Sequence, residues 1–89
     1  MQLNDEQEKK LRHMLGAEPG KYTKKQWGFR NYYCASQGGV DNAQLLEMAE
    51  AGIVAQGHMG EKTIYFHATE AGCKAIGLTK AQIDRAFDR

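Results

Sequence analysis

The chain has 89 residues, of which 42% are hydrophobic and 26% are charged, and its net charge is +1. This composition is typical of one small globular domain over residues 1–89 and excludes an intrinsically disordered chain. No apolar run approaches the roughly 18 residues of a membrane-spanning helix, and the polar start MQLNDEQEKK is unlike a signal peptide. We therefore expect a cytoplasmic protein.

The first expected helix covers residues 5–15. Asn4 occupies its N-cap, and Gln7 stands three residues later, where its side chain can return the capping hydrogen bond. Gly16 is placed to end the helix. The apolar stripe of this helix consists of Leu11, Met14 and Leu15.

The stretch KKQWGFRNYYCASQGG, residues 24–39, gives mixed signals. Thr23 and Gln26 form a second capping box, which predicts one or two helical turns from Lys24. Gly28 and the β-prone YYC disfavour a longer helix, so we expect extended chain over residues 32–35 and then a loop. In so small a core, the large apolar residues of this stretch are also expected to be buried. They are Trp27, Phe29 and one of the tyrosines.

A second clear helix is expected over residues 42–51. Asp41 is predicted as its N-cap, with Val40 packed on Leu45 as a hydrophobic staple. Gly52 is predicted to end it in a Schellman motif. The residues expected to face the core are Leu45 and Met48.

Two strands and two short helices are expected in the rest of the chain. The strands, residues 53–57 and 63–68, alternate apolar and polar side chains or are β-branched, and glycines stand between them, which predicts a hairpin. Thr69 is the predicted cap of a short helix that ends near Gly77. Thr79, with Gln82 three residues later, caps the last helix. The predicted fold class is therefore α+β, built from helices and a two-stranded hairpin.

Residues about 40–78 resemble a winged-helix domain, in which a helix, a glycine turn and a two-stranded wing lead into another helix. The matching positions are Leu46, Gly52, Ile53, Val54, Tyr65, Thr69 and Gly72. YYCASQGG stands where the family has its second helix. The whole chain is also similar to small uncharacterised proteins of tailed phages and prophages, through LRHMLG, RNYYC and EAG. That similarity implies a phage or prophage origin and the cytoplasm of the host cell, and it brings no activity.

Charge is unevenly distributed along the chain. Residues 9–33 carry seven basic side chains and one acidic side chain, whereas residues 34–73 carry one basic and five acidic side chains. Together with the winged-helix resemblance, this predicts nucleic-acid binding through a basic and aromatic face at residues about 21–33. The acidic helix at 42–51 is not expected to enter a DNA groove. The candidate binding residues are Lys21, Lys24, Lys25, Arg30, Asn31 and Tyr32, with help from Lys9, Lys10 or Arg12.

Two other interpretations of the sequence stay open. The lysines can be a solvated rim around core aromatic residues, and the two charged faces also suit a protein-interaction module. Such a module would bind a host or virion protein, an acidic surface or a second copy of this chain. No enzyme, cofactor, small-molecule substrate or metal site is expected, because no catalytic motif occurs and the histidines lack ligand spacing. Cys34 and Cys73 are expected to be free and buried.

Overall fold

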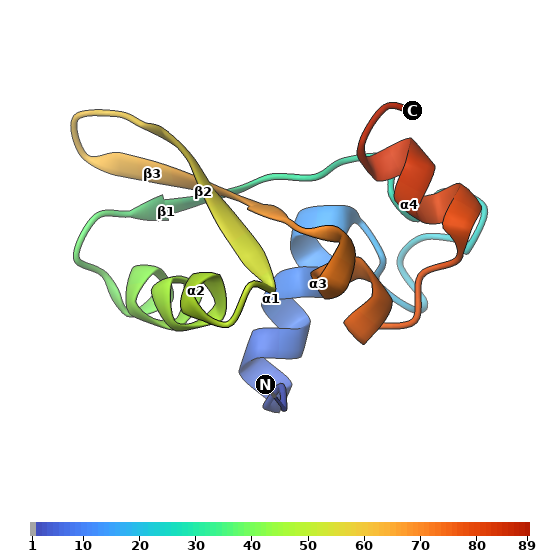
Figure 1. Cartoon of the computed structure of the whole chain (residues 1–89), viewed down its shortest axis with the longest axis horizontal. Coiled ribbons are helices and arrows are strands. Elements are labelled where there is room, and N and C mark those ends of the chain that lie inside the picture. Colours follow the sequence, from blue (N-terminus) through green and yellow to red (C-terminus); the bar gives the residue numbers. More distant parts are fainter. Residues whose placement is uncertain (1) are drawn as a thin grey trace.

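The computed structural model describes residues 2–89. Within these residues the chain forms four helices and three strands in the order α1, β1, α2, β2, β3, α3, α4 (Figure 1). The helices are α1 (Asp5–Leu15), α2 (Val40–Glu50), α3 (Glu70–Ala75) and α4 (Lys80–Ala86), and the strands are β1 (Tyr33–Ser36), β2 (Val54–Met59) and β3 (Thr63–Ala68). The fold is a small α+β fold, as the sequence predicted.

The three strands form one antiparallel sheet in the order β1-β3-β2. The predicted hairpin is present as β2 and β3, with Val54 opposite Ala68. A sheet of only two strands was the wrong expectation, because β1 pairs with the free edge of β3 and places Ala35 opposite Ile64. The extended conformation of β1 was predicted, but its partner lies about thirty residues away and left no local signal.

Three of the helix starts are as predicted. The Asn4 side chain accepts the backbone N–H of Gln7 at 2.8 Å, and the Gln7 side chain accepts the backbone N–H of Asn4 at 3.0 Å. Thr79 and Gln82 form the same reciprocal box at α4. Thr69 caps α3 through its hydroxyl oxygen. Since these caps satisfy otherwise unpaired N–H groups, they fix where the short helices begin.

The start of α2 differs from the prediction. Gly39, not Asp41, is the N-cap, and Val40 is 77% exposed instead of packing on Leu45. The Asp41 carboxylate is drawn away from capping by the Lys10 ammonium and the Tyr33 hydroxyl. The predicted Schellman ending is confirmed by the hydrogen bond from Ile53 N to Met48 O at 2.9 Å. It is accompanied by the bond from Gly52 N to Ala49 O at 3.0 Å.

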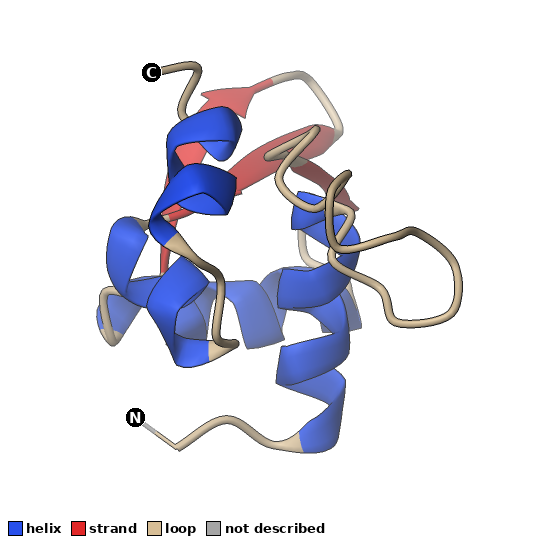
Figure 2. Ribbon diagram, turned by 90° about the vertical axis from the view of Figure 1, so that its right-hand side faces the viewer, coloured by secondary structure: helices blue, strands red, loops and turns tan. Residues whose placement is uncertain are grey.

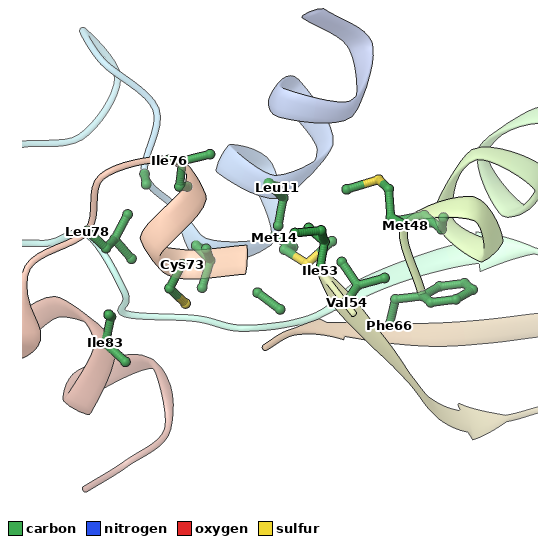
Figure 3. Close-up of a cluster of buried hydrophobic side chains, with 14 of the residues drawn as sticks. Leu11, Met14, Met48, Ile53, Val54, Phe66, Cys73, Ile76, Leu78 and Ile83 are labelled. Carbon is green, nitrogen blue, oxygen red and sulfur yellow. The ribbon is translucent and has the colours of Figure 1, made fainter. Parts of the chain in front are cut away.

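Helices α1 and α2 lie on the same side of the sheet (Figures 1 and 2), and the core fills the space between them and the strands. Figure 3 shows side chains from α1, α2, β2, β3 and the α3–α4 region meeting in one cluster. Leu45 and Met48 are fully buried, which confirms that prediction. The largest fully buried side chains are Phe66, Leu11, Met14, Leu15, Leu45, Met48 and Val54.

The stretch from Thr23 to Phe29 is a run of hydrogen-bonded turns, so the one or two helical turns predicted from Lys24 are present only as turns and not as a regular helix. Trp27 is buried as predicted. Phe29 was also expected to be buried, but it is 50% exposed, because its ring lies over Gly16 at the surface. The ring packs edge-on against Tyr22, with 5.0 Å between the ring centroids. The tyrosines are also less buried than expected, and each one is half-buried or exposed.

The two free cysteines differ in exposure. Cys73 is buried as expected, but Cys34 is exposed, since it stands opposite Tyr65 on the side of the sheet that faces away from the helices. No helix formed by residues 2–89 is long and apolar enough to cross a membrane.

Candidate nucleic-acid interface

Helix α4 fixes the predicted basic stretch by holding its backbone. The Gln82 side chain donates to the carbonyl oxygen of Lys24 at 2.9 Å. The Arg85 guanidinium donates to the carbonyl oxygens of Lys25 and Trp27, the latter at 3.0 Å. These contacts leave the side chains of Lys24 and Lys25 exposed and bring the exposed Arg85 beside them. We call Lys24, Lys25 and Arg85 the basic rim.

Gly28 allows this close approach between the turn and two helices. Its backbone has φ 90°, its N–H donates to Leu15 O at 2.9 Å, and a Cβ atom would lie 2.3 Å from the carbonyl oxygen of Gln82. Any side chain at this position would therefore push the turn away from α4.

The other predicted lysines are less available than the basic rim. Lys21 is exposed but lies 3.5 Å from the Glu18 carboxylate. Lys10 is buried and paired with Asp41 at 3.3 Å, so it adds nothing to the positive surface. Arg12 is half-buried and paired with Glu8 at 2.9 Å, although its guanidinium lies 5.8 Å from the Trp27 ring centroid. The Lys24 ammonium lies 6.0 Å from the same centroid.

Arg30 and Tyr32 form one unit at the start of β1. The guanidinium carbon of Arg30 lies 4.3 Å from the Tyr32 ring centroid, and its Nη2 atom donates to the Tyr32 carbonyl oxygen at 3.3 Å. Its Nε atom is buried and has no acceptor among the described residues. The tyrosine ring is 46% exposed. The pair therefore combines a half-buried cation with a partly exposed aromatic ring.

Asn31, in contrast, is part of the fold. Its side-chain oxygen accepts the backbone N–H of Ala68 at 2.7 Å, and its side-chain nitrogen donates to the Ala68 carbonyl oxygen at 3.2 Å. A carboxamide committed in this way cannot also form the bidentate pair that reads a base edge. We therefore exclude Asn31 from the candidate interface.

The outer face of the sheet, which points away from α1 and α2, adds rings that the sequence analysis did not select. Tyr32 lies 6.4 Å from Tyr65 of β3, and Tyr65 lies 6.3 Å from His58 of β2, measured between ring centroids. The Cys34 side chain on the neighbouring strand raises the pKa of Tyr65 above its ordinary value. The alternation of side chains in the sequence of β3 already placed Tyr65 on the polar side of that strand. Its position beside Tyr32 could not be predicted, because it depends on the pairing of β1 with β3.

His67 covers the neighbouring part of this face. Its Nδ1 atom lies 2.6 Å from the carbonyl oxygen of Asn31, and because that oxygen can only accept, Nδ1 carries the proton. At its other end, the ring lies so close to Gly57 that a Cβ atom there would be 2.5 Å from Nε2. The ring therefore bridges the chain before β1 and strand β2.

A separate hollow of about 550 Å³ lies beside α1. Its charges are mutually paired: Glu6 lies 3.8 Å from Lys9, Asp41 lies 3.3 Å from Lys10, and Glu18 lies 3.2 Å from His13. These pairs balance one another, and the lining therefore favours no single sign of ligand charge. The residues that line it are Glu6, Lys9, Lys10, Arg12, His13, Glu18, Pro19, Tyr33 and Asp41.

Comparison of the chain with protein-family models, curated proteins and solved structures found no match. Within residues 2–89, no three His, Cys, Asp or Glu side chains are grouped so that they could hold a metal ion.

Proposed function

We propose that the chain is a small non-enzymatic protein that binds nucleic acid through the basic rim and the Arg30–Tyr32 pair. The observation that carries this proposal is the combination of exposed cations with an exposed ring along one segment of chain, held in place by backbone contacts to α4. Exposed cations neutralise phosphates and release counterions, and an exposed ring offers a stacking surface.

The charges on α2 favour binding of nucleic acid to the basic rim and the Arg30–Tyr32 pair over binding to α2. The exposed positions of α2 include Glu47 and Glu50, and the helix contains no lysine or arginine. Carboxylates on a groove-facing helix would be repelled by the phosphates that line the groove.

We also propose that the scaffold is winged-helix-like, with β2 and β3 as the wing, and that it is of phage or prophage type. The position of α2 directly before the hairpin, and the pairing of β1 with β3, support the winged-helix-like scaffold. The phage or prophage type rests on the resemblance of LRHMLG, RNYYC and EAG alone. A single helix, α2, lies between β1 and β2, so the domain would lack the second helix of the family and its usual docking.

Binding to labelled random-sequence DNA and RNA, measured over a series of salt concentrations, tests the proposed function. We expect affinity to fall steeply with salt and the double variant Lys24→Glu, Lys25→Glu to bind too weakly to measure. In the milder variant Lys24→Gln, Lys25→Gln, the slope of log affinity against log salt should fall by about two, because two phosphates are no longer neutralised. The matched control is Glu47→Lys with Glu50→Lys, which makes two charge reversals on α2 and should strengthen nonspecific binding. A native protein that binds no nucleic acid at low salt would refute the proposal.

A second candidate function is protein association through α2. Its exposed side combines apolar and acidic side chains, a pattern that suits a partner with a basic surface. These side chains are Val40, Ala43, Leu46, Glu47 and Glu50. The basic rim of a second copy has the complementary charge, so salt-sensitive self-association in light scattering, lost in the Glu47→Lys, Glu50→Lys variant, would favour this function.

A further inference from the structure

A row of aromatic rings crosses the outer face of the sheet from one edge to the other. Tyr32 precedes the edge strand β1, Tyr65 lies on the central strand β3, and His58 lies on the other edge strand β2. Neighbouring ring planes are inclined by 49° and 46° at centroid distances of 6.4 and 6.3 Å. At these distances and angles the rings do not stack on one another. The Arg30 guanidinium covers one face of the Tyr32 ring, and the ring is 46% exposed.

The spacing of the row favours separated bases over a double helix. Stacked bases follow each other at about 3.4 Å along one strand, and the rings are spaced at nearly twice that distance. A duplex also presents only the edges of its bases in the grooves, so rings on a sheet cannot reach the base faces. A single strand, whose bases can be splayed out, offers those faces directly.

Charge on the same face suits the backbone of such a strand. The half-buried Arg30 guanidinium lies over Tyr32 at one end of the row and places a positive charge beside that ring. The segment that contains Arg30 runs from the α4 side of the molecule to the sheet (Figure 1), so it leads from the basic rim to the rings. Phosphates thus have cations along a path that ends at the stacking positions.

We propose that the outer face of the sheet binds single-stranded nucleic acid, with bases stacked on Tyr32, Tyr65 and His58 and the backbone following Arg30 toward the basic rim. This inference rests on the proposed function and names the ligand class of the same interface. The helices α1 and α2 cover the opposite side of the sheet (Figures 1 and 2).

The test uses fluorescence anisotropy with three labelled probes: oligothymidylate, oligouridylate and a duplex, each of about 12 nucleotides or base pairs, within the site sizes of single-strand binders. Tyr65→Leu removes the central ring but keeps an apolar side chain. It should weaken binding of the single strands about 5- to 150-fold, the effect of losing one stacked base, and leave duplex binding and the salt slope unchanged. Tyr65→Phe, which keeps the ring, should bind like the native protein.

The outcomes separate this inference from the proposed function. Binding of single strands that Tyr65→Leu and His58→Ala do not weaken, or a native preference for the duplex, overturns the inference and leaves the proposed function standing. Failure to bind any probe at low salt overturns both. If the melting curve of Tyr65→Leu shows that it does not fold, Tyr32→Leu takes its place, because Tyr32 is exposed. Tighter binding of either single strand than of the duplex supports the inference.

Discussion

The side chain of Asn31 pairs with the backbone of Ala68 in the way that another strand residue would. Its oxygen accepts from Ala68 N at 2.7 Å and its nitrogen donates to Ala68 O at 3.2 Å. This pairing continues the β1–β3 contact beyond the last backbone pair, Tyr33 with Phe66, at the point where β3 ends. Asn31 thereby ties the chain before β1 to the end of β3.

Asn31→Ala should therefore lower stability more than it lowers binding. Losing two part-buried hydrogen bonds is expected to cost about 1–3 kcal/mol of unfolding free energy, because the Ala68 amide loses its acceptor. Urea denaturation measures this change. At temperatures where the variant is folded, its affinity for nucleic acid should stay within about twofold of the native value, since a base-reading asparagine would lose far more. A variant of native stability that binds weakly would return Asn31 to the interface.

The adjacent residues Leu45 and Leu46 of α2 should differ in how much they contribute to stability. Leu45 is fully buried and Leu46 is 42% exposed. Leu45→Ala should lower the unfolding free energy by about 2–4 kcal/mol, because it leaves a cavity among close-packed side chains. Leu46→Ala should change it by less than about 0.5 kcal/mol. Thermal melts of the two variants check this, and a Leu45→Ala melt close to the native one would mean that α2 is peripheral to the core.

The two thiols should react at very different rates. Cys34 is exposed on the outer face of the sheet, whereas burial raises the pKa of the Cys73 thiol to about 11. Since the thiolate is the reactive form, a thiol reagent should titrate one cysteine quickly in the folded protein and the second only after denaturation. Cys34→Ser should abolish the fast phase and leave the slow one. Two fast phases in the native protein would contradict the burial of Cys73.

Asp41 should contribute to stability in a pH-dependent way. The hydrogen bond from Tyr33, followed by that from Lys10, lowers the pKa of Asp41 below its ordinary value of 3.8. A lowered pKa means that the folded state favours the carboxylate. Its contribution is therefore fully present above pH 3.8 and is lost as the pH falls through the lowered value. Asp41→Asn should lower the unfolding free energy near neutral pH by about 1 kcal/mol, a modest value because the carboxylate is half exposed.

Urea denaturation across the acid range measures the Asp41 effect. The difference in unfolding free energy between the native protein and Asp41→Asn should shrink as the pH drops below 3.8, the ordinary pKa of that carboxyl group. Tyr33→Phe is the companion variant: it removes one of the two donors and should reduce the acid dependence only in part. If the unfolding free energies of the native protein and Asp41→Asn differ by the same amount at all pH values, Asp41 does not make a pH-dependent contribution to stability.

The elements with local determinants were predictable from the sequence. The capping boxes at Asn4 and Thr79, and the Schellman ending of α2, are decided by residues within a few positions of each other. The burial of Leu45 and Met48 likewise follows from helical spacing.

The features that were missed depend on contacts between distant parts of the chain. Asp41 does not cap α2, because its carboxylate is bonded to Lys10 and Tyr33. Strand β1 pairs with β3, which lies about thirty residues further along the chain. Arg85 joined the basic stretch through a contact across 60 positions. Of the six candidate site residues, Asn31 was drawn into the fold by Ala68 for the same reason.

Helix α4 holds residues 24–27 by their carbonyl oxygens, and this separates the shape of that surface from its chemistry. Every amino acid has a carbonyl group, so the hydrogen bonds from Gln82 and Arg85 do not depend on which side chains stand at positions 24 and 25. Acidic, aromatic or cysteine side chains could replace the two lysines while the turn keeps its path. A spectroscopic label or a new charge can therefore be introduced at positions 24 and 25. Substitution of these two residues would change what the surface binds and would leave the fold unchanged.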